Sequence, residues 1–197
     1  MELRDVLPGD LDPILALNNA AGPGIIEIGR ERLMLLERQA HYFRVALIEG
    51  RIAGFLVAFE PGACYDSPNY AWFGERYGPG GFVYIDRVVV APGCRRHGVG
   101  RVMYADLLSY AEIRQPMLTT EVFIEPKDDI AMVFFTTQNF AEVGQQTLPN
   151  GRRVSLMAKE LEPYAYVHEH YLTRPDNPAP AHWWASRRTD LSARPHA

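Results

Sequence analysis

Cysteine, net charge and long apolar runs are all scarce in this sequence, and each shortage excludes a class of protein. The two cysteines, Cys64 and Cys94, fit no metal spacing, and we expect them to be free thiols of a cytoplasmic protein. No apolar run approaches the ~18 residues of a membrane span, and the first residues lack the pattern of a signal peptide. A formal net charge of −4 gives no reason to expect a nucleic-acid partner.

Two common phosphate-binding motifs are missing as well. The sequence contains neither the G-x-x-x-x-G-K-[ST] of an ATP-binding P-loop nor the G-x-G-x-x-G of a dinucleotide-binding fold. No cysteine or carboxylate completes a persuasive site with His168, His170 and His182, so no metal is expected. The length of 197 residues and the hydrophobic content of 47% instead suit one sizeable globular domain.

The order of apolar and polar segments predicts an α/β protein with a mixed sheet. We expect strands at residues 1–7, 41–48, 51–60, 82–92 and 116–126, helices at 8–21, 29–40, 99–114 and 128–140, and two closing strands within 141–161. Glu49 and Gly50 form the turn of the clearest hairpin, so the early strands are antiparallel. The later strand–helix–strand segment requires a parallel crossover.

Two segments fall outside this order. Residues 61–81 are rich in glycine, proline and aromatic residues, and we interpret them as a long loop, which in compact domains is usually functional or disordered. The composition changes at Glu162, because the residues from there on hold five of the 15 prolines and four of the six histidines. We therefore place the domain at 1–161. Residues 162–197 are interpreted as an extension that packs on the body or on a partner chain, or is partly disordered.

A glycine-containing turn precedes the helix that begins near residue 99. In "APGCRRHGVGRVMYADLL" the spacing Arg95-x-x-Gly98-x-Gly100 combines positive charge with small residues. A helix N-terminus exposes unpaired N–H groups, and glycine lets a ligand approach that backbone closely. The pattern predicts a site for a pyrophosphate, and the alternative is an ordinary turn with solvated arginines.

These residues resemble the R/Q-x-x-G-x-G/A motif of the GNAT acetyltransferase superfamily. The preceding "VVVAP" is similar to the family's apolar strand, "DIAMVFFTTQNF" to its helix that starts at Ala131, and "EVG...GRRVSLMAKEL" to its closing hairpin. The resemblance covers about residues 1–161. It implies a mixed, mostly antiparallel central sheet of about seven strands, with helices on both faces and a splay between the fourth and fifth strands.

The resemblance implies acetyl-CoA as the cofactor. Backbone groups of Val88, Val89 and Val90 would contact the pantetheine arm, and an N–H near Val89 would hold the thioester oxygen. The implied pyrophosphate contacts are Arg95, Arg96, His97, Gly98, Val99, Gly100 and Arg101. Asp128 stands near the position where many members have an asparagine that contacts pantetheine. Phe135 replaces a tyrosine that can protonate the leaving thiolate, and Phe135 lacks the hydroxyl for that role.

The implied reaction is direct attack of a primary amine on the thioester within a ternary complex. An alkylammonium with a pKa near ~10 must first lose a proton, and a carboxylate can accept it. The candidate carboxylates are Asp86 on the fourth strand and Glu121 on the fifth, and Tyr84 is a candidate proton donor. Two-residue alternation predicts that Asp86 shares a strand face with Tyr84, Val88 and Val90. The structural alternative for Asp86 is an ion pair with Arg87.

The candidate substrate-binding residues lie before the fourth strand and between the first two helices. Tyr70, Trp72 and Phe73 would line an acceptor pocket or else pack the segment onto the core. Glu27 would bind an acceptor ammonium or else be a solvated surface charge. Arg152 and Arg153 are expected at the surface or at a dimer edge.

Together the sequence predicts a cytoplasmic N-acetyltransferase that acts on a small-molecule amine. One alternative is a non-catalytic module that binds acyl-CoA, which Phe135 favours. Another is an acetyltransferase that acts on protein N-termini or lysines. The resemblance also allows a homodimer.

Overall fold

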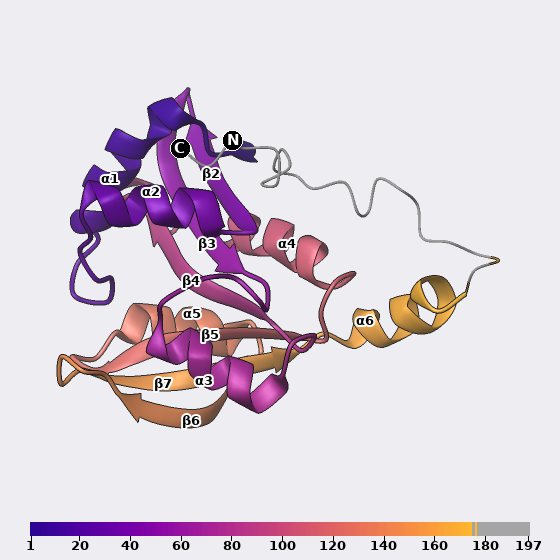
Figure 1. Ribbon diagram of the computed structural model, residues 1–197. Coiled ribbons are helices and arrows are strands. Elements are labelled where there is room, and N and C mark those ends of the chain that lie inside the picture. The colour runs from indigo at the N-terminus through magenta and orange to yellow at the C-terminus, as the bar shows by residue number, and fades with distance from the viewer. Residues whose placement is uncertain (175, 177–197) are drawn as a thin grey trace.

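A seven-stranded sheet forms the centre of the computed structural model, which describes residues 1–174 and 176 (Figure 1). The strands are β1 (Glu2–Asp5), β2 (Tyr42–Ile48), β3 (Arg51–Phe59), β4 (Val83–Val90), β5 (Met117–Glu125), β6 (Ala141–Thr147) and β7 (Arg153–Glu160). Their order in the sheet is β1-β2-β3-β4-β5-β7-β6. Only the β4–β5 pair is parallel among these described strands, so the predicted mixed, mostly antiparallel sheet is confirmed.

Helices cover both faces of the sheet, as predicted. They are α1 (Leu11–Asn19), α2 (Arg30–Gln39), α3 (Pro68–Tyr77), α4 (Val99–Ala111), α5 (Asp129–Thr137) and α6 (Glu162–Val167). The first three contribute side chains to one buried cluster, whereas α4 and α5 contribute to a second cluster on the opposite face. We refer to these clusters as the α1–α3 core and the α4–α5 core.

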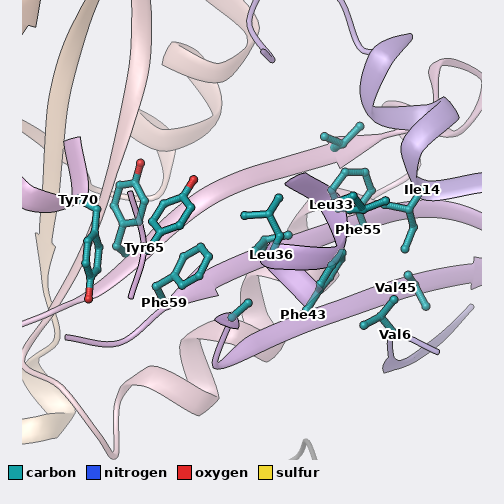
Figure 2. Close-up of a cluster of buried hydrophobic side chains, with 14 of the residues drawn as sticks. Val6, Ile14, Leu33, Leu36, Phe43, Val45, Phe55, Phe59, Tyr65 and Tyr70 are labelled. Carbon is teal, nitrogen blue, oxygen red and sulfur yellow. The ribbon is translucent and has the colours of Figure 1, made fainter. Parts of the chain in front are cut away.

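The α1–α3 core combines aliphatic side chains with Phe43 and Phe55 at one end and has the aromatic side chains of Phe59, Tyr65 and Tyr70 at the other, as Figure 2 shows. Ile14, Leu33 and Leu36 from the helices pack against phenylalanines of the sheet and are at most 1% exposed. At the other end, the ring of Tyr65 stacks on Phe59 at a centroid separation of 4.0 Å. Burial of such side chains supplies the main driving force for folding. The aromatic end of the core lies beside the point where β4 and β5 separate.

The β2–β3 hairpin turns at the predicted residues. Glu49 and Gly50 have φ angles of 51° and 74°, which is the geometry of the type I′ turn that matches the twist of paired strands. The hairpin prediction is therefore confirmed in both position and turn chemistry.

The predicted loop at 61–81 is wrong in its middle, where the chain forms α3. Ser67 caps this helix, because its hydroxyl accepts a hydrogen bond from the N–H of Tyr70, and Pro68 occupies the first helical position. Tyr70, Phe73 and Tyr77 recur at helical spacing and contact the α1–α3 core. The glycines and prolines that suggested a loop lie mostly at the two ends of this helix.

The described part of the C-terminal segment begins with α6 and continues as a π-helical turn at His168–Leu172. The N–H of Leu161 donates to the carbonyl oxygen of Pro116 at 2.7 Å, and Tyr164 packs against the α4–α5 core. The helix then projects beyond the end of the sheet (Figure 1). The rest of the predicted extension, including His182, lies outside the described residues. No helix in the described residues is long and apolar enough to cross a bilayer.

Candidate active site

The fourth and fifth strands part directly before two carboxylates. Val83, Tyr84 and Ile85 of β4 pair with Leu118, Thr119 and Thr120 of β5, and the pairing stops there. Asp86 and Glu121 are the next residues on the two strands. The two candidate bases therefore stand where the splayed gap opens.

A β-bulge at Asp86 changes the direction of the residues that follow it. Ala58 of β3 pairs with Ile85 and Val57 pairs with Arg87, so Asp86 is an extra residue on β4. Tyr84 packs in the α1–α3 core, whereas Val88 and Val90 pack against the α4–α5 core. The predicted shared face of Tyr84, Asp86, Val88 and Val90 is therefore wrong, because the bulge interrupts the two-residue alternation.

Glu121 is the acceptor of hydrogen bonds from two neighbouring side chains. The hydroxyl of Tyr84 donates to Oε2 of Glu121 at 2.6 Å, and the amide of Asn69 on α3 also donates to this carboxylate. Asn69 is itself held by Gln146 of β6, whose Nε2 lies 3.2 Å from Oδ1 of Asn69. Elements on both sides of the gap thus fix the position of Glu121.

The carboxylate of Asp86 forms an ion pair with the neighbouring Arg87. Nε of Arg87 lies 2.5 Å from Oδ2 of Asp86, and the side chains of Arg87 and Asp86 are 9% and 5% exposed. The hydroxyl of Tyr65 donates to the other carboxylate oxygen, and Nη1 of Arg87 donates to Asn18 of α1 at 2.7 Å. These contacts match the structural alternative that the sequence left open for Asp86.

The surroundings of Glu121 give it the pKa of a base that works near neutral pH. Burial, together with the negative charge of Asp86, raises the pKa of Glu121 to about 8, although the hydrogen bonds from Tyr84 and Asn69 partly oppose this rise. Burial and the charges of Glu121 and Asp86 raise the pKa of Tyr84 well above its usual value. The Tyr84 hydroxyl therefore stays protonated and available as a hydrogen-bond donor.

The glycine turn presents unpaired backbone amides at the start of α4. The φ angles of Arg96 and Gly98 are 64° and 81°, and a Cβ on Gly98 would meet no atom within 4 Å. The N–H of Val102 donates to the carbonyl oxygen of Gly98 at 3.0 Å, where the helical hydrogen bonds of α4 begin. The first N–H groups of a helix have no partner within the helix, and such a helix N-terminus fits the diphosphate of a CoA thioester.

The side chain of Arg95, the first residue of the motif, links the glycine turn to two other segments. Nε of Arg95 donates to the carbonyl oxygen of Val90 at 3.2 Å, and Nη2 donates to that of Ala21 at 3.3 Å. The side chain of His97 is exposed, and its Nδ1 lies 2.8 Å from the carbonyl oxygen of Arg95. Arg95 thus ties the turn to the segment between α1 and α2, while Arg96 and Arg101 remain exposed beside it.

The other predicted cofactor residues lie on β4 and at or within α5. Val88, Val89 and Val90 pair with β3 on one side, and none of the described strands pairs with them on the other. Asp128 caps α5, because its Oδ1 accepts a hydrogen bond from the N–H of Ala131 at 2.9 Å. Phe135 is 5% exposed and packs edge-to-face against its aromatic neighbours in the α4–α5 core.

The predicted substrate-binding residues of α3 do not line the cavity that holds Glu27. Phe73 is fully buried, and Tyr70 is 8% exposed with its hydroxyl bonded to the backbone of Ala63 and Glu60. Trp72 lies against Gly144 of β6, where a Cβ would come within 2.9 Å of its ring. All three side chains pack α3 onto the sheet, which is the packing alternative.

Glu27 lies in a cavity of about 440 Å³ between the α1–α2 segment and the β6–β7 turn. The cavity is lined by Gly22, Pro23, Ile25, Ile26, Glu27, Asn150 and Arg152. The sequence placed Arg152 at the surface or at a dimer edge and assigned no role to Asn69 or Asn18. Nothing in the sequence could assign those two, because their contacts join segments that are distant along the chain.

Comparison with protein-family models matches residues 13–140 to the Acetyltransferase (GNAT) family. The chain belongs to this family. The GNAT domain contains the glycine turn, the parting strands and both carboxylates. This GNAT protein is therefore an acyltransferase of a family that uses acetyl-CoA as its acyl donor. None of the curated proteins matches the sequence.

Solved structures of other acetyltransferases share the fold of this GNAT protein. Ard1 from Thermoplasma volcanium is 18% identical, with a TM-score of 0.65 over 81% of this chain and 97% of that chain. Naa20 from Chaetomium thermophilum, in complex with a bisubstrate analogue, is 20% identical, with a TM-score of 0.65 over 90% and 94%. The ribosomal-protein-S18-alanine N-acetyltransferase from Escherichia coli is 15% identical, with a TM-score of 0.59 over 81% and 93%.

Proposed function

We propose that the protein transfers the acetyl group of acetyl-CoA to a primary amine of a small molecule, with Glu121 as the general base. The observation that carries this proposal is the position of Glu121 at the parting of β4 and β5, with its pKa raised to about 8. A base whose pKa lies near the working pH combines a useful deprotonated fraction with useful basicity.

The acyl donor binds along the open edge of β4. Its thioester supplies the electrophilic carbonyl carbon and a thiolate leaving group. The amides of residues 96–101 hold the diphosphate, with Arg96 and Arg101 close by to add positive charge. The unpaired edge of Val88–Val90 receives the pantetheine arm as an added strand would. Asp128 and Phe135 contribute indirectly to binding of the acyl donor. Asp128 caps the N-terminus of α5, and Phe135 packs the buried face of this helix against the core.

Glu121 removes the proton from the acceptor ammonium at the gap. The amine nitrogen then forms a bond to the carbonyl carbon, the bond from that carbon to sulfur breaks, and the second proton of the nitrogen passes through solvent to the departing thiolate. The Tyr84 hydroxyl donates to Glu121 and holds the carboxylate in place. Because a thiol has a pKa near ~8.5, the thiolate leaves without a dedicated acid, so Phe135 does not prevent the reaction.

We assign the acceptor to the cavity beside Glu27. It measures about 440 Å³ and is open to solvent, because most of its lining residues are exposed. Glu27 would attract the acceptor ammonium electrostatically, and Ile25 and Ile26 would contact its apolar part.

A second candidate acceptor is the N-terminus of a polypeptide. The cavity lies between two exposed segments, and structural neighbours include an N-acetyltransferase that acts on a ribosomal-protein alanine. An extended chain end entering between the α1–α2 segment and the β6–β7 turn would present the same primary amine to Glu121.

Release of CoA with a panel of amines and short peptides tests the proposal. The wild-type protein should release CoA with at least one amine, and Glu121→Gln should reduce kcat by about 100-fold or more while leaving acetyl-CoA binding intact. Asp86→Asn is the matched comparison and should keep an inflection from Glu121 but move it to lower pH, because the charge of Asp86 raises the pKa of Glu121. CoA binding without turnover across the whole panel would instead identify a non-catalytic module.

A further inference from the structure

The helix α3 and the edge strand β6 pack together in matching register. Trp72 of α3 lies against Gly144 of β6, where a Cβ would come within 2.9 Å of the indole ring. Asn69 lies one helical turn before Trp72, and it contacts Gln146, which shares a strand face with Gly144. The lack of a side chain at Gly144 thus lets α3 approach β6 closely enough for the two amide side chains to meet.

The amides of Gln146 and Asn69 form a chain of hydrogen bonds that ends at the proposed base. Nε2 of Gln146 donates to Oδ1 of Asn69 at 3.2 Å. The other end of the Asn69 amide, Nδ2, donates to the carboxylate of Glu121. Asn69 is 4% exposed, so water has little access to replace either partner.

The orientation of the Asn69 amide decides which of its two ends Glu121 meets. An amide has a donor end and an acceptor end, and a half-turn of the side chain exchanges them. With Oδ1 toward Gln146, the Nδ2 group faces Glu121 and stabilises its carboxylate. In the exchanged orientation, Oδ1 would face the carboxylate, and the two acceptors would repel each other. The hydrogen bond from Gln146 favours the first orientation.

The titratable and charged groups around Glu121 come from β4 and from the segment before α3. The Tyr84 hydroxyl of β4 donates to Glu121 at 2.6 Å. Burial, together with the negative charge of Asp86 on β4, raises the pKa of Glu121. Arg87 pairs with Asp86, and the hydroxyl of Tyr65 donates to the same carboxylate. To these groups α3 adds an uncharged donor.

We propose that Gln146 is a positioning residue for the general base: it holds the Asn69 amide with its donor end toward Glu121, which keeps the carboxylate available to accept the proton of the amine. This inference rests on the proposed function, because it assumes that Glu121 is the base. In the sheet, β7 separates β6 from β5, so the contact of β6 with α3 is the link that relates Gln146 to the base.

The pH dependence of kcat/KM tests this role. Gln146→Leu removes the donor, so the Asn69 amide loses its preferred orientation, and the inflection from Glu121 should move to higher pH. The rate at pH 7 should fall about threefold to tenfold, because the carboxylate fraction falls in proportion. A lower rate with an unmoved inflection would indicate a structural role alone and overturn the proposal.

Gln145 provides the matched control on the same strand. Its side chain is exposed, its Nε2 donates to Glu142 at 3.0 Å, and its Oε1 accepts a hydrogen bond from Arg153 at 2.9 Å. Gln145→Leu removes the same kind of side chain one residue away and should leave the inflection in place. Equal shifts in the two variants would assign the effect to a general disturbance of β6 and refute the role of Gln146.

A double-mutant cycle tests whether Gln146 acts through Asn69. Asn69→Leu should move the inflection to higher pH at least as far as Gln146→Leu does. Addition of Gln146→Leu to Asn69→Leu should then cause no further shift, because the amide that Gln146 orients is gone. Additive shifts would overturn the proposal.

Gln146→Glu keeps the length of the side chain and provides a second variant if the leucine disturbs folding. The introduced carboxylate is an acceptor alone, so it should turn the Asn69 amide and present Oδ1 to Glu121. The shift of the inflection should therefore be larger with Asn69 present than in the Asn69→Leu background, where only the introduced charge acts. Shifts of equal size in the two backgrounds would contradict the proposal.

Direct titration of the Glu121 carboxyl group by carbon NMR separates this inference from the proposed function. Its signal is assigned by its loss in Glu121→Gln. A pKa of Glu121 that rises in Gln146→Leu, without turnover of any amine, would retain the orienting role of Gln146 and refute the enzymatic proposal. Turnover with an unmoved pKa would refute the role of Gln146 and retain the enzyme. An unmoved pKa without turnover would refute both.

Discussion

The ionisation of Glu121, with the hydrogen bond that its carboxylate accepts from Tyr84, should set the pH dependence of the enzyme. The carboxylate is the active form of Glu121, so kcat/KM should rise with pH through a value of about 8. The hydrogen bond from Tyr84 stabilises the carboxylate and lowers this pKa. Tyr84→Phe should therefore move the inflection to higher pH. The rate at pH 7 should fall about tenfold if the pKa of Glu121 rises by about one, because the carboxylate fraction falls in proportion.

A pH–rate profile at saturating acetyl-CoA measures this change. Glu121→Gln provides the control, because its residual activity should show no inflection near pH 8. An inflection that persists in Glu121→Gln would belong to another group, and an inflection at lower pH in Tyr84→Phe would contradict the assigned direction of the hydrogen bond.

Gly98 is the residue at which the proposed diphosphate site can be tested most directly. Its φ of 81° is accessible to asparagine and aspartate at a modest cost, and a Cβ there meets no neighbour. Gly98→Asp and Gly98→Asn therefore impose a similar backbone strain and differ in charge. We expect the aspartate to weaken acetyl-CoA binding at least about tenfold more than the asparagine, because a carboxylate would face the phosphates. Equal dissociation constants for the two variants, measured by calorimetry, would argue against a diphosphate at this turn.

At the scale of elements, the bulge in β4 is linked to the segment between α1 and α2. Asn18 is 1% exposed, and its Oδ1 accepts a hydrogen bond from Arg87 at 2.7 Å. Its Nδ2 donates to the carbonyl oxygen of Ile26 at 3.1 Å, next to Glu27 in the cavity. One side chain on α1 thus connects the ion pair at the parting strands to the segment that lines the proposed acceptor cavity.

Substitution of Asn18 should therefore affect the acceptor and spare the cofactor. Asn18→Ala should raise the KM of the acceptor by about tenfold, since the hydrogen bonds to Arg87, Ile26 and Asn19 are lost, with little change in the KM of acetyl-CoA. Asn18→Asp retains an acceptor for Arg87 but has no donor for Ile26 or for Oδ1 of Asn19, so it tests the two bonds that Nδ2 makes. Steady-state kinetics with each substrate varied will measure the split. An unchanged acceptor KM in both variants would leave Asn18 a purely structural residue.

The elements also show where sequence patterns are informative and where they are not. The Glu49–Gly50 turn was predictable because its residue types allow left-handed dihedrals. The start of α3 was encoded locally by Ser67 and Pro68, but the density of turn-forming residues in 61–81 obscured it. The bulge at Asp86 depends on pairing with β3, which is distant in the chain, and no local pattern marks it.

At the scale of the whole molecule, the sheet joins two halves that meet across the β4–β5 gap (Figure 1). The order of strands and helices predicted this architecture, because hydrophobic periodicity reports which faces are buried. The order of the elements could not predict which side chains of separate elements come into contact. The candidate site consists largely of such contacts. Glu121, for example, receives hydrogen bonds from β4 and α3.

Binding of CoA in the gap should stabilise the molecule as a whole, because the proposed contacts involve β4, the glycine turn and α5. A ligand that binds the folded state alone adds about 2.7 kcal/mol at 100 times its dissociation constant. For a chain of this size each kcal/mol raises Tm by about 2–4 °C, so CoA at that concentration should raise Tm by about 5–10 °C. Differential scanning fluorimetry measures the change in Tm, and Gly98→Asp at the same CoA concentration should show little of it. A change of equal size in that variant would mean that CoA binds elsewhere, because repulsion between the introduced carboxylate and the phosphates acts only at the glycine turn.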